Sequence, residues 1–420
     1  MAYAEKVYKV RNGKATKQFT WRARYKKPDS TWGSEPGFPT KKLAEEYGEQ
    51  QEAAIRAGRW TDPALARTTF GAWAREWMAA KAPRGNTVTT RWARLDAHIL
   101  PRWENVPLQQ ITWFDAEQWA NGLKCDDVTA THCLTLMSQI LTGAVDKQML
   151  LMNPLFGRRR SRTAAAKAAV QEKEQSDLWA PPDVVLQLAR RAGPLDGMHI
   201  LVTAFTGVRW GESLALRPSS LGVRKEGDFT CATLDVIEEV AEYAKRGPAG
   251  EKLGMVLDLE PVKTRESKRR IDVPPFLADL LSVYAASCKR EYLFTPRGGG
   301  KWRRGNFGRQ VMRPCADGRN KLPTVKGHAL RSAWKPIMPG LTMRALRHTH
   351  DTYQEQIGVK PALMYEQAGH KRPGIKAVYQ HPTPDMRRDR LDGLQGIFEG
   401  GMKALGWSGV WEELDLPNLS

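Results

Sequence analysis

The 420-residue chain lacks the cysteine pattern of a disulfide framework or a zinc site, because none of its five cysteines forms a CxxC pair and their spacing is irregular. We expect reduced thiols at all five positions: Cys125, Cys133, Cys231, Cys288 and Cys315. The first thirty residues contain no apolar segment of a signal peptide. No stretch approaches the roughly 18 apolar residues of a membrane span, and repeats and low-complexity tracts are also missing. These absences predict a soluble, cytoplasmic protein without a membrane partner.

Negative charge is scarce relative to positive charge. Lys and Arg number 65 against 46 Asp and Glu, which gives a net charge of +19. Such a chain attracts polyanions, so nucleic acid is the expected partner. A surface charge that only keeps the protein soluble is the alternative. At about 100 to 200 residues per domain, the length allows roughly two to four domains.

Residues 1–65 are predicted to form a small β-sheet-plus-helix module. Apolar and polar residues alternate strictly over 18–26, which indicates a half-buried strand. Strands over 6–11 and from Trp32, with a helix over 41–57 capped by Thr40, would complete the module. Because the exposed face of the alternating strand is basic, we predict that it contacts DNA. A basic face that is only solvated is the alternative. The candidate DNA-binding residues on this face are Arg22, Arg24 and Lys26.

Residues 69–156 change to helical periodicity and predict an all-helical domain, with helices from Phe70 and over 86–98, 113–123 and 129–149. A basic stretch rich in small residues follows, and we interpret 157–179 as an inter-domain linker. It could lie along the phosphate backbone as a clamp or remain a flexible, solvated connection. Its candidate DNA-binding residues are Arg158, Arg159 and Arg160.

Residues 180–399 show a mixed, mainly helical pattern with a small sheet. Helices are predicted over 181–191, 199–206 and 211–216, strands over 229–240, 255–259 and 269–273, and helices again beyond Pro274. The segment KTRESKR is expected to be a tight basic turn between the last two strands. A break is expected at Gly400-Gly401, followed by an apolar and acidic tail over 400–420.

Arginines in two distant clusters carry the chemistry. Arg209 follows Gly207 at the start of a predicted helix, where the helix dipole adds positive potential. Arg344 and Arg347 are three residues apart and share one helix face. Arginine supplies a planar fork of donors to the oxygens of a phosphodiester without losing its proton. Each arginine alone is typical of a surface or salt-bridge residue, but their order with His370 and Tyr379 indicates a site that binds one phosphodiester and attacks it with a phenol.

These motifs resemble the catalytic domain of the tyrosine recombinases, the phage-type integrases, over 181–396. TGVRWGESLALR is similar to the first family motif and places the first catalytic arginine at Arg209 and its supporting acid at Glu212. RALRHT matches the second motif and gives Arg347, whereas its usual histidine is Arg344 here, which cannot accept a proton as an imidazole can. AGH provides His370, and Tyr379 stands nine residues beyond it.

The resemblance implies a mechanism. Tyr379 would attack the phosphorus and leave a 3′-phosphotyrosyl bond and a 5′-hydroxyl, so that no cofactor, ATP or metal is required. Lys263 in KTRESKR would be the general acid for the departing oxygen, and His370 could accept the phenolic proton. A metal site at His348, His350, His370 and His381 is disfavoured because no Cys or carboxylate spacing supports it. Tyr353 and Tyr365 are interpreted as core residues.

The resemblance also implies an architecture and partners. Residues 69–156 are similar to the family's core-binding domain, and 1–65 to its arm-binding modules. The implied function is an integrase that acts on attachment sites in double-stranded DNA as a homotetramer, in the nucleoid of a bacterial host. An excision or directionality factor and a DNA-bending host protein would assist it. The tail could pack on its own domain or on a neighbouring protomer. A type IB topoisomerase-like nicking-closing enzyme and a non-catalytic DNA-binding regulator are the alternatives.

Overall fold

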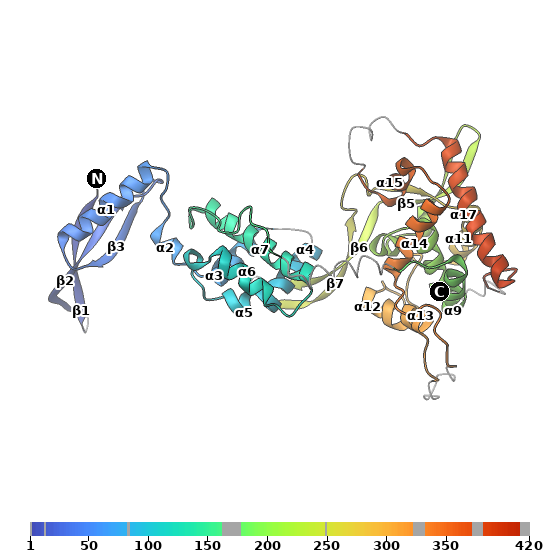
Figure 1. The fold of residues 1–420 in the computed structure, drawn as a ribbon, viewed down its shortest axis with the longest axis horizontal. Helices are drawn as coiled ribbons and strands as arrows, with labels where there is room; N and C mark the ends of the chain where they lie inside the picture. Colours follow the sequence, from blue (N-terminus) through green and yellow to red (C-terminus); the bar gives the residue numbers. More distant parts are fainter. Residues whose placement is uncertain are drawn as a thin grey trace. The chain divides into compact units, whose positions relative to one another are not determined.

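The computed structural model describes residues 2–11, 14–81, 85–161, 178–247, 250–321, 332–371 and 381–411. It is a mixed helical and sheet protein with small antiparallel sheets, as predicted (Figure 1). The chain divides into two compact units. The first comprises Met1–Lys167 with Arg246–Leu253, and the second comprises Ala168–Lys245 with Gly254–Ser420.

The first unit begins with the predicted sheet and helix. Strands β1 (Tyr3–Arg11), β2 (Lys14–Lys26) and β3 (Trp32–Phe38) pair antiparallel in that order, and helix α1 (Lys41–Arg56) packs against β1 and β2. The hydroxyl of Thr40 caps α1 by accepting from the backbone N–H of Leu43 at 3.3 Å. Alternation along β2 is confirmed at Ala23 and Tyr25, which are buried, whereas Phe19, predicted on the same face, is 41% exposed.

The part of the first unit that follows this module, up to Asp146, is helical, as predicted. Its elements are α2 (Pro63–Ala66), α3 (Phe70–Ala80), α4 (Gly85–Arg94), a π-helical turn (Leu95–Ile99), α5 (Leu100–Trp103), a 3-10 turn (Leu108–Gln110), α6 (Trp113–Asn121) and α7 (Asp127–Asp146). The pattern that predicted one helix over 86–98 therefore continues through a π turn into α5. Pro101 lies in that stretch and cannot donate the usual backbone hydrogen bond, a frequent reason for such a change.

Helix α7 qualifies the expectation about membrane spans. In the described part of the chain it is the one helix whose length and apolarity would suffice to cross a bilayer. Its apolar residues are buried against other helices of the first unit, with Cys133, Met137, Ile140 and Leu141 in the core. An apolar face that packs on neighbouring helices is the ordinary reason for such a composition.

The second unit contains two small sheets, where one prediction is wrong. Strands β4 (Leu221–Glu226), β5 (Phe229–Val236) and β8 (Arg269–Asp272) form one sheet in the order β4-β5-β8, and β6 (Glu238–Arg246) with β7 (Lys252–Pro261) forms the other. The predicted strand over 229–240 is interrupted at Ile237, and β4 was not predicted. KTRESKR contains the predicted turn, in which the N–H groups of Ser267 and Lys268 donate to the carbonyls of Thr264 and Arg265. It connects the two sheets, because β7 and β8 pair with different partners.

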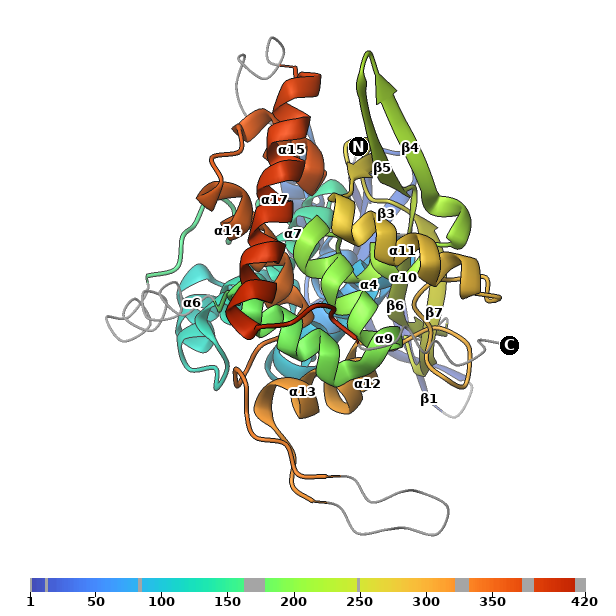
Figure 2. The same ribbon diagram turned by 90° about the vertical axis from the view of Figure 1, so that its right-hand side faces the viewer.

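Helices build the rest of the second unit around one apolar core (Figure 2). They are α9 (Pro182–Thr206), α10 (Trp210–Leu214), α11 (Pro275–Ser287), α12 (Arg304–Phe307), a π turn (Gly308–Met312), α13 (Arg313–Asp317), α14 (Met343–Gln356), α15 (Pro361–Ala368) and α17 (Pro384–Leu405). Helix α9 is broken at Gly193, between its two predicted helices. Tyr353 is fully buried, as predicted, and donates to the carbonyl of Ala180 at 2.8 Å.

The predicted break at Gly400-Gly401 is wrong, because α17 continues through both residues to Leu405. Gly401 instead permits close contact with α9, since a Cβ atom there would lie 2.9 Å from the Leu186 side chain and 3.0 Å from that of Pro182. The following residues pack on their own unit. Arg190 donates to the carbonyls of Gly409 and Val410 at 2.6 and 2.7 Å. Leu414 and the rest of the tail, like 162–177 of the linker, lie outside the described residues.

Candidate active site

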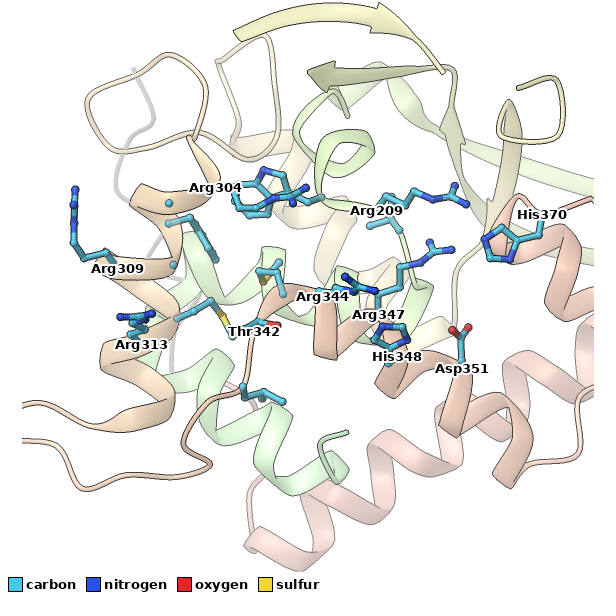
Figure 3. A pocket seen from close by; sticks show the side chains of 18 residues that line it. Arg209, Arg304, Arg309, Arg313, Thr342, Arg344, Arg347, His348, Asp351 and His370 are labelled. Atoms are coloured by element: carbon cyan, nitrogen blue, oxygen red, sulfur yellow. The ribbon is translucent and has the colours of Figure 1, made fainter. Parts of the chain in front are cut away.

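The structure brings four of the predicted site residues to one cavity of about 830 Å³ in the second unit (Figure 3). Arg209 stands at the N-terminus of α10, Arg344 and Arg347 lie one helical turn apart on α14, and His370 follows α15. Lys263 is exposed on the connection between β7 and β8 and does not line the cavity. Tyr379 lies outside the described residues.

A glycine turn positions Arg209. Gly207 ends α9 in the left-handed region with φ 66°, and a Cβ there would lie 2.6 Å from the buried ring of His350. Glycine suits this turn because it adopts positive φ without strain. The next helix then begins with Arg209 as its N-cap, whose backbone N–H donates to Glu212 at 2.9 Å while its Nη1 donates to the same carboxylate at 2.8 Å.

Glu212 is the buried anion that organises the arginines. Its side chain is 1% exposed, and Arg269 from β8 donates two hydrogen bonds to the carboxylate at 3.0 and 2.9 Å. Burial alone would raise the pKa of Glu212, but the hydrogen bonds and charge of Arg269 and the contacts with Arg209 lower it to about 2. Glu212 is therefore ionised at neutral pH and contacts Arg209, while its supporting role in the site remains a prediction.

Arg347 connects the three motifs. Its Nη1 donates to the carbonyl of Gly207 in the first motif, and its Nη2 donates to that of Ala368 in the third at 3.1 Å. Burial, together with the charge of Arg209, lowers the pKa of Arg347 to about 10. The guanidinium therefore stays cationic near neutral pH, fixed by two backbone carbonyls beside Arg209.

His370 completes the cationic side of the cavity. It follows Gly369, which ends α15 in the left-handed region with φ 65°. Burial, and then the charges of Arg209 and Arg347, lowers the pKa of His370, whereas Asp351 acts in the opposite direction. An imidazole with this bias is neutral near physiological pH and can accept a proton.

The two histidines of the second motif lie in different environments. His348 lines the cavity, whereas His350 is buried in the interior, where burial lowers its pKa to about 3.

Arg344 is exposed at the cavity and forms no hydrogen bond or ion pair with the described residues, so its donors are available to a ligand. Across the described segments of the chain, no three His, Cys, Asp or Glu side chains gather as a metal site would require.

Several residues of the site were missed from the sequence. Figure 3 shows a second row of arginines on the side of the cavity away from His370, formed by Arg304, Arg309 and Arg313. Their clustering between 303 and 313 was a visible signal of a basic helical face. Arg269 and Asp351 gave no such signal, since a lone arginine in a strand and a lone aspartate in a helix have many ordinary roles. The requirement of a buried carboxylate for cationic partners could have suggested that Glu212 needed a second arginine.

The predicted DNA-binding residues outside the cavity differ in how free their side chains are. Arg158 and Arg159 are exposed, but Arg160 donates to Asp127 and Asn121, both at 2.7 Å. Lys26 is exposed, whereas Arg22 and Arg24 lie 3.9 and 3.1 Å from the carboxylate of Glu5. The DNA contacts of all six residues remain predictions.

Comparison with known proteins extends the evidence along the chain. No family model matches it. The integrase of Mycobacterium phage FRAT1 is 22% identical over 371 residues, which cover 84% of this chain and 99% of that protein. The integrase of Mycobacterium phage D29 is 22% identical, covering 84% and 88%. Each alignment covers 84% of this chain.

The chain is similar to phage integrases over most of its length. Among solved structures, the Tn1549 transposon integrase in complex with circular intermediate DNA matches this chain at 17% identity and a TM-score of 0.48, over 76% of this chain and 98% of that one. A lambda integrase tetramer bound to a Holliday junction matches at 15% identity and a TM-score of 0.40, over 87% of this chain and 95% of that one.

Proposed function

We propose that the protein is an integrase that cleaves and rejoins double-stranded DNA at specific sites through a 3′-phosphotyrosyl intermediate. The observation that carries the proposal is the meeting of Arg209, Arg347 and His370 at one cavity, with Glu212 and Arg269 supporting Arg209. Fixed guanidinium groups stabilise the charge that grows on the non-bridging oxygens of a phosphodiester during attack. The second arginine row, at Arg304, Arg309 and Arg313, provides positive charge for neighbouring phosphates.

The reaction exchanges one phosphodiester for another. The Oη of Tyr379 bonds to the phosphorus while the bond to the 5′-oxygen breaks, and His370 accepts the phenolic proton. Lys263 protonates the departing 5′-oxygen, and its exposed side chain, which forms no hydrogen bond with the described residues, is free to approach bound DNA. In the second half, the 5′-hydroxyl of a partner strand attacks the phosphotyrosine and releases the phenol. None of these steps requires a cofactor, ATP or a metal.

The domain roles and partners belong to the same proposal. Residues 1–65 read arm sites, 69–156 bind the core site, 157–179 link them to the catalytic domain over 180–399, and a tail follows over 400–420. The protein assembles as a tetramer on DNA in the bacterial cytoplasm, with an excision factor and a DNA-bending host protein. The net charge of +19 supports contact with DNA over a large surface.

Sequencing the DNA that becomes covalently attached to the protein in cells tests the function. Adducts would be isolated under denaturing conditions and the linked DNA ends mapped. An integrase yields ends at a few defined sites. Ends scattered over the genome, together with relaxation of a plasmid that lacks those sites, would favour a topoisomerase-like enzyme, and no adduct at all would favour a non-catalytic regulator.

Arg344 is expected to act as a third donor to the scissile phosphate. Arg344→Ala should reduce single-turnover cleavage by about 30- to 1000-fold, equivalent to about 2 to 4 kcal/mol of transition-state stabilisation. Arg344→His should keep much of the activity and gain a pH dependence near about 6.5, because imidazole can donate from the same helix face. The control is Arg388→Ala, which removes an arginine that pairs with Asp385 on α17, outside the cavity. Cleavage at the normal rate by Arg344→Ala would reduce Arg344 to a surface residue.

Removal of residues 1–65 is expected to separate two DNA-binding activities. Binding to accessory arm sites should weaken, with a smaller dependence on salt, because the basic face of β2 and its phosphate contacts are lost. Cleavage of a core-site suicide substrate should persist, since the cavity belongs to the second unit. Both activities would be compared by titration at several salt concentrations, and equal loss of the two would contradict a separate arm-reading role.

A further inference from the structure

Asp351 places a carboxylate in an otherwise cationic cavity. It lies on α14 one helical turn after Arg347 and lines the same cavity as Arg347, His348 and His370. Figure 3 shows its carboxylate pointing toward the side of the cavity where Arg347 and His370 lie. A negative group in a site that binds a phosphodiester repels the ligand, so its presence calls for a role in the chemistry.

The carboxylate of Asp351 is unpaired, unlike those of Glu212 and Asp272 in the same unit. Glu212 is held by Arg269 and Arg209, and Asp272 is held by Arg224, Arg387 and Arg390 at 2.6 to 2.9 Å. Asp351 is half-buried, and within the described segments it forms neither a hydrogen bond nor an ion pair. Structural acids at this depth are ordinarily paired, so packing alone does not account for Asp351.

The charges around Asp351 determine what it can influence. On its own helix it faces Arg347, His348 and Glu355, and from the end of α15 it faces His370. His370 in turn is influenced by Arg209 of α10, Arg269 of β8 and Arg347. Burial raises the pKa of Asp351 while the neighbouring cations oppose that rise. The carboxylate of Asp351 raises the pKa of His370, whereas these arginines lower it.

We infer that Asp351 is a positioning residue that acts through His370: its carboxylate, which lines the same cavity, supplies the negative charge that lets the imidazole take the proton of the attacking phenol. The inference rests on the proposed function, in which His370 is the proton acceptor. A general base works best when its pKa is close to the working pH. The arginines that bind the phosphate weaken the imidazole as a base, and Asp351 offsets that effect.

The direct test is a histidine NMR titration of the full-length protein labelled with ¹³C at histidine Cε1. The chain has eight histidines, and His370→Asn identifies the His370 signal by its loss. Asp351→Asn should lower the pKa of His370 by roughly half a unit to one unit, less than the one to three units of a direct ion pair. Asp351→Glu, which keeps the charge, should restore most of the wild-type value.

Controls separate this effect from misfolding and from general loss of charge. The signals of His199 and His350, which are both buried, should remain unchanged across about pH 5 to 8 in every variant that is folded. Glu355→Gln removes an exposed carboxylate from the same helix outside the cavity and should leave the pKa of His370 unchanged. An unchanged pKa of His370 in Asp351→Asn, or an equal fall in Asp351→Glu, would overturn the inference.

The second measurement is the pH dependence of single-turnover cleavage on DNA recovered from cellular adducts. In Asp351→Asn the acidic limb should move to lower pH with the pKa of His370, and the plateau rate should fall about two- to threefold because the base is weaker. A uniform loss of rate at every pH would indicate a structural role and contradict the inference. The NMR titration requires no DNA, so failure of the proposed function is distinguishable from failure of this inference.

Discussion

Replacing Tyr379 with phenylalanine is expected to abolish the covalent protein–DNA adduct and to leave DNA binding nearly unchanged. The substitution removes one hydroxyl, which in the proposed mechanism is the nucleophile, and leaves every cationic side chain of the cavity in place. A loss confined to the chemical step shows that the group acts in the transition state and not in binding. Adduct formation on a suicide substrate and binding to the same DNA would be measured in parallel.

Tyr365 provides the matched control for this experiment. It is a half-buried tyrosine of α15, between the second motif and His370, and it does not line the cavity. Tyr365→Phe should form the adduct at the normal rate. Adduct formation by Tyr379→Phe, or its loss in Tyr365→Phe alone, would assign the nucleophile to another residue.

Glu212→Gln is expected to destabilise the folded protein by about 3 to 5 kcal/mol, the range found when one partner of a buried ion pair is removed. Arg269 is 4% exposed, and the substitution leaves its charge without the carboxylate that it grips with two hydrogen bonds. Arg209 also loses its contact with residue 212, so cleavage should decrease in the folded fraction. Urea-induced unfolding of the full chain, followed by circular dichroism, measures the change.

The contribution of Glu212 has a defined dependence on pH. The folded state lowers the pKa of Glu212 from 4.5 to about 2. The stabilisation by the ionised carboxylate is therefore complete above the pKa of the unfolded state and is lost as the pH falls through the pKa of the folded state. The difference in unfolding free energy between the wild type and Glu212→Gln should therefore diminish between these two pH values. A difference that stays constant over that interval would contradict the assigned ionisation.

Glu238→Gln is the control for Glu212→Gln. Glu238 also pairs with an arginine of the second unit, Arg217, at 2.6 Å, but the two side chains are 31% and 26% exposed. Solvent-exposed ion pairs contribute about 0 to 1 kcal/mol, so this variant should unfold almost as the wild type does. Equal destabilisation by the two variants would show that burial of Glu212 is not the cause.

Predictions from the sequence succeeded where the signal was local. The cap at Thr40 and the burial of Ala23 and Tyr25 on one face of β2 involve neighbours within a few residues, and the structure confirms them. They failed where the deciding partner was distant. Ile237 lies in a continuous β pattern, but the strands before and after it pair in different sheets. Gly401 was expected to end a helix, but it fits against Leu186 of α9.

By itself, the sequence determined the chemical type of the site. Binding and attack of a phosphodiester require particular side chains, and the order of Arg209, Arg347, His370 and Tyr379 is visible in the one-dimensional chain. The tertiary structure decided which groups orient them. Arg269 reaches Glu212 across 57 residues of sequence, and Arg347 reaches Gly207 across 140. No local pattern records such pairings, since a buried charge is satisfied by whichever partner the fold places beside it.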